Sequence, residues 1–139
     1  MLNSEIAQYL EANGHGTYDP TGTSGNIFID ALPSSPDEAI MIESTGGTEM
    51  DSLLGYDMPT RRILVRGELD PREPKQLVQD IYNDLHGFSN STLTEGGIFI
   101  VGVHGIQSGP VNIGQDDNNR HRFSINFRFR IRNKSTFRE

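Results

Sequence analysis

The end of the chain holds its most regular pattern of hydrophobic and polar positions. From Arg122 to Arg132, apolar side chains occupy every odd position and polar side chains every even one. Successive side chains of a strand point to opposite faces, so residues 120–132 are expected to form one half-buried β-strand. Its apolar face holds Phe123, Ile125, Phe127, Phe129 and Ile131, and its polar face holds Arg122, Ser124, Asn126, Arg128, Arg130 and Arg132.

Two other segments have the 3.6-residue spacing of amphipathic helices. Near the start, an apolar stripe ends before Gly14, and it consists of Leu2, Ile6, Tyr9 and Leu10. The second helix is expected to begin after Asp70 and Pro71, which suit a cap and a first helical position, and to end at Gly87. Its stripe consists of Leu77, Val78, Ile81, Tyr82 and Leu85.

Further short apolar runs predict the remaining strands. The last of these runs is apolar on both faces and is therefore expected to be central; the runs are 26–30, 38–44, 60–67 and 98–106. We expect one α+β domain spanning residues 1–139, with the order helix, three strands, helix, two strands. Its two layers are a mainly antiparallel sheet of about five strands and two helices on one face. Phe123, Phe127 and Phe129 then pack under Leu77, Ile81 and Leu85, and the arginines lie on the uncovered side.

Two long connections are candidates for contacts with other proteins. Residues Thr45–Thr60 and Gln107–Asn119 are long for a compact domain, and loops of this kind are usually functional. They are rich in residues that favour turns, so packing within the chain is a poor reason for their length. The candidate partner-binding residues in them are Gly46, Gly47, Tyr56, Asp57, Asp116 and Asp117.

The charges are distributed unevenly along the chain, and most basic residues lie near its end. The chain carries a net −7, but the first 119 residues hold five basic residues against 18 acidic ones, and the last 20 hold seven against one. Such a bipolar chain suggests a partner, possibly another copy of itself. The candidate contact residues are Arg62, Arg66, Arg120, Arg122, Arg128, Arg130 and Arg132.

The sequence has no pattern typical of a catalytic or metal site. The absence of cysteine excludes disulfides and thiolate ligands. The glycine-rich stretch 14–26 lacks the lysine of a phosphate loop, and the four histidines do not have the spacing of a metal site. The stretch 114–120 lacks the acid spacing of a calcium loop, and no nucleophile elbow occurs. We therefore expect no cofactor, no metal and no enzymatic activity.

The sequence also gives no sign of a membrane partner. The first residues have neither a basic region nor an apolar region of a signal peptide. The longest strongly apolar run, residues 98–103, is too short to cross a bilayer.

Two other functions stay open at this point. The first is a nucleic-acid-binding module that uses the arginine face of the strand 120–132. Net acidity argues against it, and so do the phenylalanines, which point away from the arginines, whereas base stacking needs aromatic and basic groups on one surface. The second is an enzyme with a site built from loops, for which the sequence offers no positive sign.

Several segments, in their order and spacing, resemble the minor capsid and tail terminator (tail completion) proteins of long-tailed, siphovirus-type bacteriophages. Each segment alone is weakly specific, but together they span most of the chain. They are "IFIDALPSSPDEAIMIESTGG", "GYDMPTRRILVRG", "DIYNDLHG" and "NIGQDDNNRHRFSINFRFR".

The resemblance implies a structural virion protein at the head-proximal end of the tail, assembled in the host cytoplasm. Relatives of this kind form a homohexameric ring that caps the tail tube and joins it to the head. The implied partners are other copies, the tail tube protein, the head-completion or connector protein, and double-stranded DNA passing through the ring. The arginine face would then meet a neighbouring subunit, line the lumen, or stay solvated; we favour the neighbour, because strongly basic walls would hold DNA.

Overall fold

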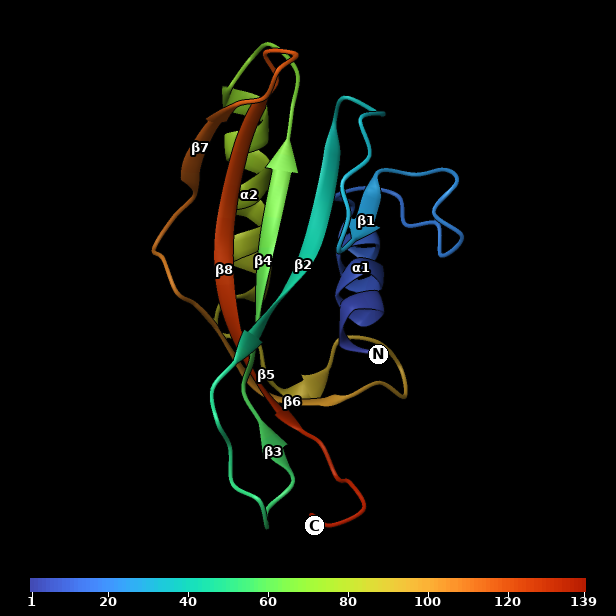
Figure 1. Cartoon of the computed structure of the whole chain (residues 1–139), viewed down its shortest axis with the longest axis vertical. Helices are drawn as coiled ribbons and strands as arrows, with labels where there is room; N and C mark the ends of the chain where they lie inside the picture. Colours follow the sequence, from blue (N-terminus) through green and yellow to red (C-terminus); the bar gives the residue numbers. More distant parts are fainter.

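Strand β8 (His121–Arg132) is the central strand of the sheet in the computed structural model, which describes all 139 residues. One edge of β8 pairs with β4 (Pro59–Arg66) and, at its end, with β3 (Tyr56–Asp57). The other edge is shared by β6 (Phe99–Gly105) and β7 (Val111–Gln115), which pair with its second and first halves. The alternating segment is thus a strand, which begins at His121 rather than at the expected Arg120, and it is paired along both edges (Figure 1).

The other strands extend the sheet on both sides. The order is β1-β2-β4-β8-β6-β5, where β1 is Ile27–Ile29, β2 is Ala39–Gly47 and β5 is Ser89–Thr92. The sheet has eight strands, so the expectation of about five was too low. The three additional strands, β3, β5 and β7, are short and have no apolar alternation that the sequence analysis could detect. They are strands because a neighbouring strand holds each of them by backbone hydrogen bonds. The sheet is also mixed, since β1 and β2 are parallel.

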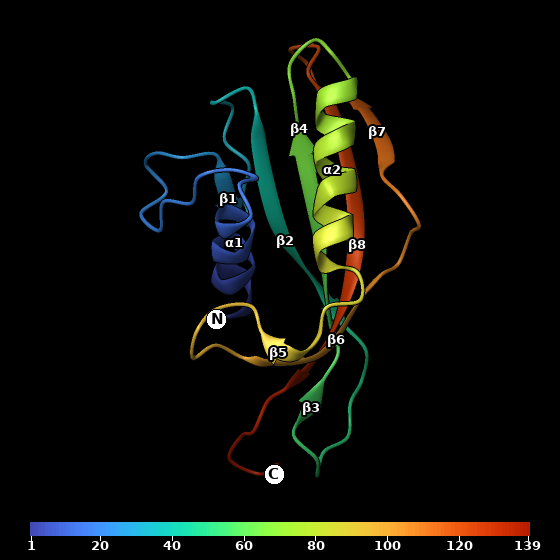
Figure 2. The ribbon, with the colours of Figure 1, turned by 180° about the vertical axis from the view of Figure 1, so that it is seen from behind.

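Both helices cover the same face of the sheet, as expected (Figures 1 and 2). Helix α1 spans Leu2–Ala12 and α2 spans Arg72–Leu85. The carboxylate of Asp70 accepts the backbone N–H of Arg72 at 3.0 Å, so it satisfies a donor at the start of α2. Neither helix combines the length and the apolar composition needed to span a bilayer.

The core lies between the helices and the apolar face of β8. Phe123, Phe127 and Phe129 are buried there together with Ile81 and Leu85 of α2, which confirms the predicted packing. Leu77 is only partly buried at the edge of this core. The even-numbered side chains of β8 therefore lie on the side of the sheet without helices, which we call the open face.

An arm, residues 48–58, projects beyond the end of the sheet between β2 and β4 (Figure 1). The expected loop Thr45–Thr60 is thus shorter, because β2, β3 and β4 extend into it. Gly47 at the base of the arm has no room for a side chain, since a Cβ there would lie 2.6 Å from the carbonyl oxygen of Met58. The C-terminal tail, residues 133–139, packs along the arm through backbone hydrogen bonds at Leu53 and Gly55.

Candidate assembly surface on the open face

The strand register places the arginines of the open face in rows with their neighbours. Directly opposite residues of an antiparallel pair share a face. Arg128 therefore lies between Thr60 of β4 and His104 of β6, and Arg130 lies beside Gly102. The seven candidate arginines do not form one uniform surface, because their contacts divide them into groups.

Arg66 and Arg120 are buried and bind their own chain. Only 3% of Arg66 is exposed, and its guanidinium donates to the backbone carbonyls of Pro36 and Asp37. Arg120 donates to the carbonyl of Ser34 and forms ion pairs with Asp37 at 3.2 Å and Asp116 at 2.8 Å. These two arginines hold the β1–β2 connection against the sheet, so we leave them out of the candidate surface.

Asp116, one of the predicted partner-binding residues, belongs to the same internal network. Burial raises its pKa, but hydrogen bonds from the backbone N–H groups of Arg120 and Asn118 and from the Arg120 guanidinium outweigh it, so the pKa is lowered. Burial, followed by repulsion from Arg120, lowers the pKa of Arg66, whose guanidinium nevertheless stays charged. Asp117 lies exposed in the same turn.

In the middle of the open face the charges are partly compensated. Arg62 forms an ion pair with Glu43 across β2 and β4, with 2.9 Å between Nε and Oε1, although the approach lacks the geometry of a hydrogen bond. Arg122 donates from its Nη2 to the carbonyls of Ile113 and Gln115, although its Nε has no hydrogen-bond partner.

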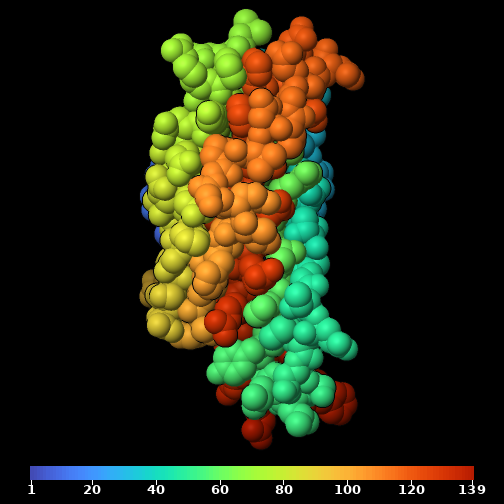
Figure 3. Space-filling model, turned by 90° about the vertical axis from the view of Figure 1, so that its left-hand side faces the viewer, coloured from blue at the N-terminus to red at the C-terminus, as the bar shows by residue number.

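Arg128 and Arg130 are the uncompensated charges of this face. No hydrogen bond or ion pair within the chain satisfies either guanidinium, and the Nε of Arg128 is buried without a partner. Figure 3 shows β8 (red) reaching the surface between the segment that follows β6 (orange) and the arm (teal). A buried donor without a partner costs about 1–3 kcal/mol. The Arg130 guanidinium is exposed and has no partner in the chain, so it is accessible to an acceptor supplied by another molecule.

A small apolar hollow lies beside Arg130. Its volume is about 190 Å³, and besides Arg130 it is lined by Met50, Tyr56, Asp57, Met58 and Val101. The guanidinium of Arg132 stacks on the Tyr56 ring at 4.8 Å and donates to the carbonyl of Gly55 at 2.9 Å. The structure thus brings the predicted residues Tyr56, Asp57, Arg130 and Arg132 together at the base of the arm.

Asp57 is the residue that ties the arm to the C-terminal tail. Its carboxylate accepts two hydrogen bonds from Arg138, at 2.8 and 2.9 Å, and one from Asn133 at 2.6 Å. These bonds, led by that of Arg138, lower the pKa of Asp57. Arg138 also donates to the carbonyls of Asp51 and Tyr56, so one side chain holds several points of the arm.

The tip of the arm, residues 49–54, exposes two leucines that the sequence interpretation missed. Leu53 is 72% and Leu54 53% exposed. The Asp51 carboxylate accepts both of their backbone N–H groups, at 2.6 and 3.0 Å, and these bonds lower its pKa. Glu49 is exposed and makes no ion pair or side-chain hydrogen bond within the chain. The sequence signal for these exposed residues was a pair of adjacent leucines within a connection rich in turn-forming residues.

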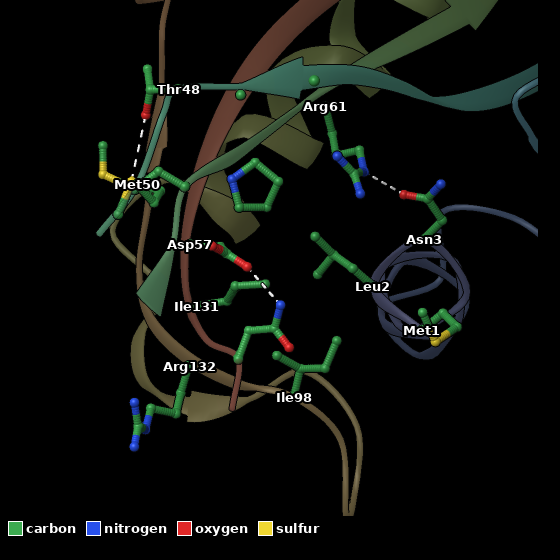
Figure 4. Close-up of a pocket in the computed structure, with 15 residues that line it drawn as sticks. Met1, Leu2, Asn3, Thr48, Met50, Asp57, Arg61, Ile98, Ile131 and Arg132 are labelled. Carbon is green, nitrogen blue, oxygen red and sulfur yellow. Dashed lines mark hydrogen bonds between the residues drawn. The ribbon is translucent and has the colours of Figure 1, made fainter. Parts of the chain in front are cut away.

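A larger pocket lies on the other side of the arm base, next to the start of α1 (Figure 4). It measures about 500 Å³ and includes Leu2, Ile98 and Ile131. Its charged groups are already engaged, since Arg61 donates to Asn3 and Asp57 accepts from Asn133. Burial lowers the pKa of Arg61. The uncompensated charge near the arm is therefore on the open face rather than in this pocket.

Two of the three comparisons with known proteins found a match. A family model described as "Bacteriophage tail terminator protein" matches residues 9–133. A chain of the solved structure "Virion of native gene transfer agent (GTA) particle" has the same fold, with a TM-score of 0.66 over 94% of both chains at 17% sequence identity. The comparison with curated proteins found no match.

Proposed function

This chain belongs to the bacteriophage tail terminator family, a structural family, and we propose that it forms a ring that caps the tail tube and joins it to the head. In this proposal the ring is a homohexamer at the head-proximal end of the tail. Its partners are the tail tube protein on one side and the head-completion or connector protein on the other. Assembly takes place in the host cytoplasm.

The observation that carries the proposal is the pair Arg128 and Arg130. The chain has a net charge of −7, yet these two guanidiniums find no acidic partner within it. A closed ring is built from heterologous contacts, in which one patch of a subunit meets a different patch of the next. A basic patch on an acidic subunit suits such a contact, because the neighbour offers the acidic surface.

The same geometry argues against the two alternatives for the arginine face. A single-strand-binding surface needs aromatic rings beside its basic groups, and Phe123, Phe127 and Phe129 are buried on the opposite face. A basic lumen would bind the phosphates of passing double-stranded DNA and hinder its movement. We therefore assign Arg128 and Arg130 to contacts between subunits, together with Arg62, Arg122 and Arg132 at their margins.

The long connections are proposed to carry contacts with other proteins of the assembled tail, neighbouring copies of this chain included. The segment Gln107–Asn119 contains β7, but it still presents exposed residues, including Val111 at 40% and Ile106 at 48% just before it. Hydrogen exchange on free and tail-bound protein tests this assignment. Protection of 45–60 and 107–119 on binding supports it, and equal exchange in both states contradicts it.

Tail length is the direct test of the function. We expect tails assembled in a host lacking this protein to be overlong and without heads in electron micrographs. The unmutated protein supplied from a plasmid should restore uniform, head-bearing tails. Tails of normal length without the protein would overturn the proposal. A salt-sensitive shift of labelled DNA by the purified protein would favour a nucleic-acid-binding module instead.

A further inference from the structure

We propose that the surface around Arg128 and Arg130 receives the arm tip of a neighbouring copy. This inference rests on the proposed ring and names the contact that would build it. We call the receiving surface the socket; it comprises the two arginines and the hollow beside Arg130. The tip comprises residues 49–54.

The two surfaces have complementary chemistry. The socket combines two uncompensated positive charges with an apolar hollow, whose walls include Met50, Met58 and Val101. The tip combines two exposed leucines with the carboxylates of Glu49 and Asp51. Apolar surface thus meets apolar surface, and carboxylates meet guanidiniums that have no partner in their own chain.

The hollow also has a suitable size. At about 190 Å³ it has room for one aliphatic side chain of the size of leucine. Leu53 and Leu54 are adjacent, and the Asp51 carboxylate fixes the backbone of both by accepting their N–H groups. The tip is therefore preorganised, so docking requires little further ordering of the backbone.

The tip is held away from the socket of its own chain. Leu53 and Leu54 do not line the hollow and stay exposed, although Met50, Tyr56 and Met58 of the same arm form its wall. The backbone bonds from Gly55 and Glu139 and the Arg138–Asp57 ion pair fix the arm in this direction. Met50 belongs to both tip and socket, but the leucines and carboxylates of the tip lie outside the hollow, so they form a different patch from the socket of their own chain. The contact between tip and socket is head-to-tail, the type that a closed ring requires.

Cross-linking in assembled tails tests the contact, because the natural chain contains no cysteine. The variant Leu54→Cys/Val101→Cys is incorporated into tails and treated with a short bis-maleimide. We expect a ladder of multiples of the chain mass on a denaturing gel. Each single variant should remain at the mass of one chain, and tails built from a mixture of the two single variants should give dimers and nothing larger.

Other outcomes of the cross-linking would overturn the inference. A double variant that stays at the mass of one chain in properly terminated tails shows that tip and socket do not meet, while the ring function stands. Dimers from Leu54→Cys alone show that two tips meet symmetrically. If tails need no terminator at all, the proposed function fails first, and the tail-length experiment reveals this separately.

A charge exchange gives a second test that does not depend on cysteine chemistry. Glu49→Arg and Arg130→Glu each place like charges at the contact, and both positions are exposed, so the chain should still fold. Each variant alone should produce overlong tails, and the combination Glu49→Arg/Arg130→Glu should restore normal length in at least part of the tails. A double variant as defective as the worse single variant would contradict the pairing.

Discussion

Arg66 and Arg130 lie on the same face of the sheet, but only Arg66 is bound within the chain. Arg66 is 3% exposed and donates to two backbone carbonyls, whereas Arg130 is exposed and has no partner. The open face therefore has two parts. One holds the β1–β2 connection in place, and the other is available to another molecule.

The two arginines should differ in their effect on stability. Arg66→Ala removes a buried guanidinium and its two hydrogen bonds to backbone carbonyls, so we expect the free energy of unfolding to fall by about 1–3 kcal/mol. Arg130→Ala removes an exposed side chain, and the change should stay within about 0.5 kcal/mol. Urea denaturation of both variants measures the difference. Equal effects of the two substitutions would show that the division of the face is wrong.

The core position of Phe127 gives a larger expected effect. Phe127 is fully buried under α2, and truncating such a residue leaves a cavity, so Phe127→Ala should cost about 3–5 kcal/mol. Phe137 is 89% exposed in the C-terminal tail and serves as the matched control. Thermal unfolding should show a large loss for Phe127→Ala and almost none for Phe137→Ala. An unchanged melting temperature for Phe127→Ala would mean that the phenylalanine face of β8 is not the buried face.

The ion pair between Arg138 and Asp57 should hold the arm in place. Arg138→Ala removes the two hydrogen bonds to that carboxylate, so hydrogen exchange at Gly55 and in the C-terminal tail should become faster. Exchange in the middle of β8 should not change, because those amides belong to the sheet. Lys134→Ala is the control, since Lys134 is exposed and makes no ion pair. Unchanged exchange at Gly55 would contradict this prediction and show that other contacts hold the arm in place.

The same contact should depend on pH in one direction. The hydrogen bonds from Arg138 lower the pKa of Asp57 in the folded protein below its value of about 4 in the unfolded chain. The contribution of this carboxylate to stability is therefore fully present above about pH 4 and is lost as the pH falls through the folded-state pKa. The difference in unfolding free energy between the natural chain and Arg138→Ala should be constant from about pH 5 to 8. It should shrink in acid, and a difference that grows on acidification would contradict this account.

The sequence was most informative where a hydrophobic pattern was long and regular. The alternation of residues 122–132 predicted the central strand, its buried face and its arginine face, and the stripe around Ile81 predicted α2. Asp70 accepts the N–H of Arg72 as a capping residue would, but Pro71, the expected first helical residue, is at the N-cap position. The family resemblance was also confirmed, because order and spacing of several segments carry information that no single motif has. β5 and β7 were not predicted, since "SNST" and "VNIGQ" form strands only because β6 and β8 offer hydrogen-bond partners.

The candidate site was predicted only in part, because the contacts that define it join residues that are distant in the sequence. Charge alone could not separate Arg66 and Arg120 from Arg128 and Arg130, because the difference lies in carbonyls and carboxylates that are distant in the sequence. Asp57 looked like a partner-binding residue, but Arg138, which is 81 positions away, occupies its carboxylate. The exposure of Leu53 and Leu54 depends on the direction of the arm, which the sequence pattern does not specify.

Charge reversal of the uncompensated pair tests the central claim, that Arg128 and Arg130 contact another subunit in the terminated tail. The variant Arg128→Glu/Arg130→Glu is compared with Arg72→Glu/Lys75→Glu, which reverses two exposed charges on α2. Both variants should fold, and tail length in electron micrographs is the measurement. We predict overlong tails for the first variant and normal tails for the second. Normal, properly terminated tails with the first variant would contradict the claim, and poor DNA ejection from them would place these arginines in the lumen.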